Sequence, residues 1–281
     1  AEQIFTTYAR HIGIGGIATA GVIGIIKSWS ISKSAVGLAG NELKGQNTQT
    51  ADTIRTHRDL PMKRIAIGTI LTLIVTFIFF YFGVVGNLFH ALIGLLVVGI
   101  IAFLFTTVAA NAIAIVGTNP VSGMTLMTLF LASIVLVAVG LKGAAGMVSA
   151  LIIGGVVCTA LSMAGGFITD LKIGYWLGTT PAKQQQWKFL GTLVAAATVG
   201  GVMMILNKTY GFVGEHALVA PQANAMAAVI EPLMSGGGAP WVLYGIGAII
   251  SIALTFFGIP ALAFSLGMFI PLELNLPLLS G

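Results

Sequence analysis

Long apolar stretches separated by shorter polar ones occupy most of this 281-residue chain. A bilayer crossing needs about 20 apolar residues in helical geometry. The stretch over 88–116 is too long for one straight crossing, so we expect it to tilt or break near Asn111. The last stretch contains Pro271 and Pro277 and is expected to be bent or re-entrant. The pattern predicts an all-α, polytopic transmembrane helical bundle of about eight spans with broken or re-entrant segments, near 11–31, 65–83, 88–116, 124–140, 146–168, 189–207, 240–258 and 260–279.

Composition agrees with a membrane protein and excludes several other classes. Hydrophobic residues make up 57% of the chain and charged residues 7%, against roughly 25% charged in soluble domains. The single cysteine, Cys158, cannot form an internal disulfide, and the four histidines are too scattered to bind a metal. No phosphate-binding loop of the ATPase type is present. We therefore expect no cofactor, no catalytic metal, no nucleic-acid partner and no enzymatic activity.

The basic residues predict the orientation in the membrane. Ten lysines and arginines fall on the segments 27–64 and 169–188, whereas the opposite side carries only Arg10, Lys142 and Lys208. Because cytoplasmic loops are enriched in basic residues, 32–64 and 169–188 are expected to be cytoplasmic loops. The segment 208–239 is then extracellular or re-entrant. The expected location is the cell membrane, with a prokaryotic inner membrane as the first choice.

The segment Thr118–Thr125 interrupts two apolar stretches with the residues TNPVSGMT. Pro120 lacks an N–H and disfavours helical geometry in Asn119, so a helix break is expected there. Irregular backbone at membrane depth must be buried in protein or line a cavity. We expect Asn119, Ser122 and Met124 to approach a central cavity together with 221–238. An ordinary short turn between two spans is the alternative.

Three acidic residues adjoin apolar spans and are candidates for proton coupling. Asp170 begins the polar stretch that follows one span, Glu231 precedes a proline in 220–238, and Glu273 lies in the last span. An ionisable group within the membrane is a functional candidate. The alternatives are an interfacial anchor around Asp170 and a plain surface helix around Glu231. Tyr175, Gln222 and Asn224, from the same two segments, complete the expected substrate-binding set.

Four stretches together carry a family resemblance: GTNPVSGMT (117–125), AGGFITDLKIGYWLGTTPAKQQQ (164–186), LVAPQANAMAAVIEPLMSGGGAPWVLYGIGA (218–248) and SLGMFIPLELNLPLLSG (265–281). In this order they resemble the later part of the oligopeptide transporter superfamily, which includes the yellow-stripe-like metal-chelate transporters. The stretch 8–28 is similar to a mid-chain helix of that family. Members have about sixteen spans, so the chain resembles a C-terminal half.

The resemblance implies a secondary active transporter that takes up small peptides, peptide-like compounds or metal chelates by proton symport. Its partners would be this substrate, protons, the lipid bilayer and a missing N-terminal half or another subunit. Residues 1–281 would form one transporter domain. The alternatives are a non-catalytic structural subunit of a membrane complex and a membrane-embedded enzyme.

Overall fold

The computed structural model describes residues 4–27, 29–43, 55–116, 121–212, 221–235 and 240–270. Within these ranges the regular structure is helical. The longest helices are α5 (Leu88–Val116), α7 (Gly143–Leu177) and α8 (Pro181–Thr209). The others are α2 (Arg10–Lys27), α3 (Trp29–Leu43), α4 (Met62–Phe79), α6 (Val121–Ala138), α9 (Pro221–Met234), α10 (Trp241–Phe256) and α11 (Ala261–Phe269), with π-helical turns η1 (Phe5–Ala9) and η3 (Phe80–Val85) and the 3-10 turn η2 (Arg55–His57).

Each predicted span contains a helix, and the predicted helical membrane bundle is confirmed. Five helical stretches of the described chain are long and apolar enough to cross a bilayer, by length and composition. Two further apolar helices, Met124–Ala138 and Trp241–Phe256, are shorter. The helix of the last predicted span ends at Phe269, and 271–281 lie outside the described residues. The five full-length stretches are Thr7–Lys27, Met62–Val85, Leu88–Ala110, Gly143–Leu177 and Pro181–Thr209.

The stretch 88–116 was expected to tilt or to break near Asn111, and the break is wrong, because α5 runs without interruption from Leu88 to Val116. No proline occurs inside this helix, so nothing in its backbone forces a kink. The break expected at Asn119 and Pro120 lies outside the described residues, and α6 begins directly afterwards at Val121.

Helical residues extend into both segments that we expected to be cytoplasmic loops. The segment 32–64 contains most of α3. In 169–188, α7 continues to Leu177, Gly178 closes it with φ of 68°, and α8 begins at Pro181. Glycine in the left-handed conformation ends helices and proline favours their first turn, so these two residues convert the segment into a tight helical hairpin.

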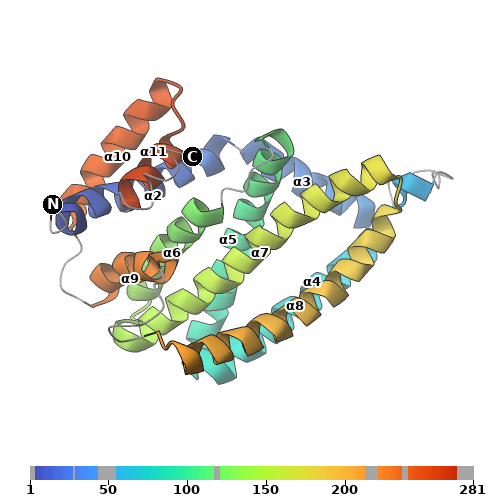
Figure 1. Cartoon of the computed structure of the whole chain (residues 1–281), viewed down its shortest axis with the longest axis horizontal. Helices are drawn as coiled ribbons and strands as arrows, with labels where there is room; N and C mark the ends of the chain where they lie inside the picture. Colours follow the sequence, from blue (N-terminus) through green and yellow to red (C-terminus); the bar gives the residue numbers. More distant parts are fainter. Residues whose placement is uncertain are drawn as a thin grey trace.

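The helices form two packed groups that share α6 (Figure 1). In one group α2 packs closely on α10 and α11, and in the other α6 and α5 pack on α7 while α9 covers α6. The interior of the bundle is apolar, and its most fully enclosed side chains include Phe105, Met127, Leu129, Ile153 and Leu161.

The α8 helix lies at the outside of this bundle (Figure 1). No residue in the most apolar part of α8 is buried. Only 6% of the most apolar part of Met62–Val85, which includes α4, is buried. Because the two helices are strongly apolar, these faces require lipid or protein to cover them.

Candidate functional site

The described part of the predicted substrate site lies where α6, α9 and α2 meet. Met124 is buried on α6, Ser122 lies in the same helix, and Gln222 and Asn224 lie in α9. The side chains of Ser122, Gln222 and Asn224 and the whole of Asn119 lie outside what the structure describes. The α6 helix packs on α9, so the two helices that carry these residues are neighbours.

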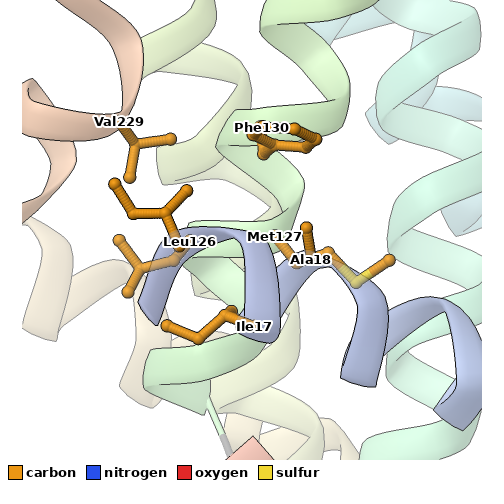
Figure 2. Close-up of a pocket in the computed structure, with 7 residues that line it drawn as sticks. Ile17, Ala18, Leu126, Met127, Phe130 and Val229 are labelled. Atoms are coloured by element: carbon orange, nitrogen blue, oxygen red, sulfur yellow. The ribbon is translucent and has the colours of Figure 1, made fainter. Parts of the chain in front are cut away.

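The space between these helices is a narrow apolar seam (Figure 2). It leaves no room for a water molecule in the described structure. In Figure 2, Leu126 of α6 lies between Val229 of α9 and Ile17 of α2, with Phe130 of α6 to one side. The seam is therefore closed here, and the central cavity expected beside Met124 stays a prediction.

A buried group of polar atoms lies near this seam, and our sequence analysis missed it. The His11 and Tyr244 rings are 5.9 Å apart, and Tyr244 also meets Phe130 edge-on at 5.8 Å. The Arg10 guanidinium lies 5.7 Å from the Phe269 ring. Arg10 Nε, His11 Nδ1 and the Tyr244 hydroxyl are buried without a hydrogen-bond partner among the described residues. Buried polar atoms normally have partners, so these three together form a candidate site for a polar ligand.

The sequence contained part of the signal for this group. Arg10 and His11 lie in the stretch Thr7–Lys27, which is long and apolar enough to cross a membrane. Ionisable residues inside spans are costly and usually functional. Tyr244 gave no comparable signal, because aromatic residues are common in apolar helices.

Asp170 lies near the end of α7 and forms an ion pair with Lys188 of α8. The Asp170 side chain is 47% exposed and that of Lys188 32%. The Gln184 side chain donates a hydrogen bond to the Asp170 carbonyl at 3.3 Å. At 35 residues α7 is about 52 Å long, well above the roughly 30 Å of a hydrocarbon core. Asp170 therefore lies near a membrane boundary, where it joins two helices.

The other predicted residues are more exposed or lie outside the described chain. Tyr175 is 68% exposed, and Lys172 lies over its ring at 5.4 Å. Glu231 is exposed on α9. Glu273 lies outside the described residues.

The two basic segments meet at one end of the bundle. Arg55 Nη2 donates to the Gly178 carbonyl at 2.8 Å, and the Ala182 amide donates to the Arg58 carbonyl at 2.9 Å. The Leu60 amide donates to Gln185 Oε1 at 2.8 Å. These bonds place 55–60 beside the α7–α8 hairpin. Parts of the two basic segments therefore lie at the same end of the bundle, which is what a common side of the membrane requires.

Below this contact, α7 and α8 diverge around an apolar cleft of about 300 Å³. Met163, Ala164 and Phe167 line it from α7, and Phe189 and Thr192 from α8. Ile65 at the start of α4 lines a third side. Sequence reasoning did not find this cleft, because its existence depends on how far two neighbouring helices separate.

These features define a multi-pass helical membrane protein with polar groups enclosed among its helices. The chain belongs to the family whose description is OPT oligopeptide transporter protein, since the family model matches residues 1–281. The chain is 26% identical over 321 aligned positions to a Haemophilus influenzae protein named "Putative oligopeptide transporter". The match covers 100% of this chain and 50% of that protein, so the chain spans about half the length of this relative. No solved structure matches.

Proposed function

We propose that this chain is part of a secondary active transporter that moves small peptides, peptide-like compounds or metal chelates across a prokaryotic cell membrane. The observation that supports this most directly is the set of buried polar atoms Arg10 Nε, His11 Nδ1 and the Tyr244 hydroxyl, on half-buried Arg10 and His11 and buried Tyr244, in a chain from an oligopeptide transporter family. A transporter needs polar groups inside the membrane that form hydrogen bonds or ion pairs with the substrate while it is bound. The proposal includes no catalysis and no cofactor.

The substrate would bind where α2, α6, α9 and α10 meet. An arginine guanidinium suits a carboxylate, which peptides and many metal chelators carry. His11 and Tyr244 would orient the bound group. We propose that Asn119, Ser122, Met124, Gln222 and Asn224 line the pathway nearby once the seam between α6 and α9 opens, and that Tyr175 lies at its entrance.

Coupling to protons would act through Asp170, with Glu231 and Glu273 as the other candidates. Protonation of Asp170 removes the charge that pairs with Lys188, and this pair links α7 to α8. Loss of the pair would let the α7–α8 hairpin change its geometry. A carboxylate that holds two helices together only in its charged form is a simple way to make movement depend on protons.

The rest of the protein would supply part of the substrate pathway. The α4 and α8 faces are apolar and exposed, and the relative is about twice as long as this chain. We propose that the missing N-terminal half, or another subunit, packs against this bundle.

Counterflow in liposomes tests the transport function. The full-length protein is reconstituted with unlabelled peptide inside, and uptake of labelled peptide is followed without a proton gradient. Transient accumulation above equilibrium is expected only if the protein carries substrate, and a parallel series uses a metal chelate. Absence of counterflow for both substrate types, with protein shown to be folded and inserted, would favour a structural subunit.

A further inference from the structure

We propose that the cleft between α7 and α8 binds an anionic phospholipid, with an acyl chain in the cleft and the headgroup on the basic residues at its mouth. The cleft adjoins the Asp170–Lys188 pair of the proposed coupling, since Lys188 is among its lining residues, but the inference does not depend on transport. Four observations support it: the depth of the cleft in the membrane, its volume, the protein partners of its polar side chains and the basic residues around its mouth.

The depth follows from the aromatic residues on the same two helices. Tyr175 and Trp176 near the end of α7 and Trp187 in α8 are 68%, 72% and 69% exposed. Exposed tryptophan and tyrosine residues on membrane helices favour the level of the lipid headgroups. Phe167, which lines the cleft, lies eight residues before Tyr175, or about 12 Å along the helix. The cleft therefore opens at hydrocarbon depth, directly below the headgroup level.

The volume and the lining suit a hydrocarbon chain. The cleft of about 300 Å³ is at the lower end of the range for ligand pockets, roughly 300–1,000 Å³. Its walls are formed mainly by Met163, Phe167, Phe189 and Ile65. A peptide backbone placed here would leave its N–H and C=O groups without partners, which is costly, whereas an acyl chain has no such groups.

The polar residues in the lining already have protein partners. Gln185 accepts from the Leu60 amide and donates to Asp59 Oδ1 at 3.1 Å. Lys188 pairs with Asp170, and the Thr192 hydroxyl donates to the Lys188 carbonyl at 2.8 Å. The cleft therefore presents an apolar surface to its occupant even at these three positions.

The mouth of the cleft is basic. Arg58, Lys63, Arg64 and Lys183 lie within two residues of the lining residues Leu60, Ile65 and Gln185, against the single carboxylate of Asp59, which accepts from Gln185. All four basic side chains are exposed, and none forms an ion pair within the part of the chain that the structure describes. The hydrogen bonds between 58–60 and 182–185 hold these segments together above the cleft. Basic pockets next to transmembrane helices bind anionic headgroups, so the charge selects a phosphatidylglycerol-like lipid over a zwitterionic one.

Native mass spectrometry of the full-length protein tests the headgroup. The protein in detergent is titrated with phosphatidylglycerol and with phosphatidylcholine that carry identical acyl chains. We expect tighter binding of phosphatidylglycerol by about fivefold or more, the effect of one or more basic residues near the charge. The combined variant Arg58→Gln, Lys63→Gln, Lys183→Gln is expected to lose this preference and to bind phosphatidylcholine as the wild type does.

The matched control removes charge from the opposite ends of the same helices. Lys142 precedes α7 and Lys208 lies in the last turn of α8. The variant Lys142→Gln, Lys208→Gln is expected to keep the phosphatidylglycerol preference. Equal binding of both lipids by the wild type, or an equal loss in the control variant, would overturn the proposal.

A second test concerns the acyl chain. Ala164→Trp places a large side chain in the cleft without a change in charge and is expected to lower retention of both lipids about tenfold, whereas Ala253→Trp on the exposed face of α10 leaves it unchanged. In the wild type, a phosphatidylglycerol with a photoreactive tail should crosslink to peptides from 160–170 and 186–195. Crosslinks confined to other helices would contradict the site even if Ala164→Trp fails to fold.

Discussion

At the scale of a single residue, the hydroxyl of Tyr244 allows a role in packing to be distinguished from a role in substrate binding. The side chain is 5% exposed, yet its hydroxyl has no hydrogen-bond partner among the described residues. Substitution of a buried polar group that lacks a partner by an apolar group of the same shape is nearly neutral or stabilising. A hydroxyl that serves only packing would therefore be dispensable, while one that contacts substrate would not.

We predict that Tyr244→Phe leaves the melting temperature in detergent unchanged or slightly higher while substrate affinity falls about tenfold, the worth of one good hydrogen bond to a charged group. Substrate binding is measured by calorimetry and the melting temperature by differential scanning fluorimetry. Tyr210→Phe, at a tyrosine that is 58% exposed, is the control and should change neither. Unaltered affinity in Tyr244→Phe would remove this hydroxyl from the substrate site.

Asp170 tests the coupling proposal. Asp170→Asn keeps a polar side chain but cannot release a proton, so we expect it to abolish pH-driven accumulation while substrate exchange continues. Uptake into proteoliposomes is measured with and without an imposed pH gradient. Glu231→Gln and Glu273→Gln serve as comparisons, because Glu231 is exposed and Glu273 is the remaining candidate. Full accumulation with wild-type pH dependence in all three variants would place the coupling group in the other half of the protein.

The pairing of α2 with α10 shows how small residues determine packing at the scale of helices. A Cβ atom added to Gly247 would lie 2.8 Å from the Gly16 amide nitrogen, and one added to Gly15 would lie 2.7 Å from the Tyr244 carbonyl carbon. The two backbones are therefore in direct contact. Close approach of this kind lets transmembrane helices gain van der Waals and polar contacts that lipid cannot replace. It also holds His11 of α2 beside Tyr244 of α10.

We predict that Gly247→Ala lowers the free energy of unfolding by about 1–3 kcal/mol, because backbone on both sides of the contact must shift. The matched control is Gly245→Ala on the same helix, where an added Cβ meets nothing within 4 Å. The control should be neutral or stabilised by roughly 0.5–1 kcal/mol, since alanine favours a helix over glycine. Urea unfolding in mixed micelles measures both variants, and equal effects would show that the close contact contributes little.

The sequence predicted some elements and not others for identifiable reasons. The central parts of α5, α7 and α8 follow from their long apolar stretches. In 169–188, which we expected to be a cytoplasmic loop from its basic residues, Gly178 and Pro181 each have a defined place at a helix end and leave only a short connection between α7 and α8.

At the scale of the whole molecule, the basic residues are distributed between the two ends of the bundle. The hydrogen bonds between 55–60 and 178–185 place the two basic segments together, and Lys142 and Lys208 lie at the opposite ends of α7 and α8. The positive-inside rule then assigns the basic end to the cytoplasm.

Cysteine labelling tests this orientation. In a full-length protein without native cysteines, Arg58→Cys and Lys183→Cys should react with a membrane-impermeant maleimide only in inverted vesicles. Lys142→Cys and Lys208→Cys should react only in intact cells. The reverse pattern would invert the topology but leave the fold unchanged, whereas reaction of Arg58→Cys and Lys183→Cys from opposite sides would contradict the contact between the two basic segments.

The sequence by itself determined the membrane class, the helical fold and the family, because these depend on composition, on apolar length and on local motifs. Tertiary structure alone decided which side chains meet. Arg10 and His11 lie more than 200 residues before Tyr244, and Asp170 reaches Lys188 only because the hairpin is tight. The cleft between α7 and α8 likewise arises from the angle between two helices. Such contacts depend on how whole elements pack, and local sequence patterns do not specify that packing.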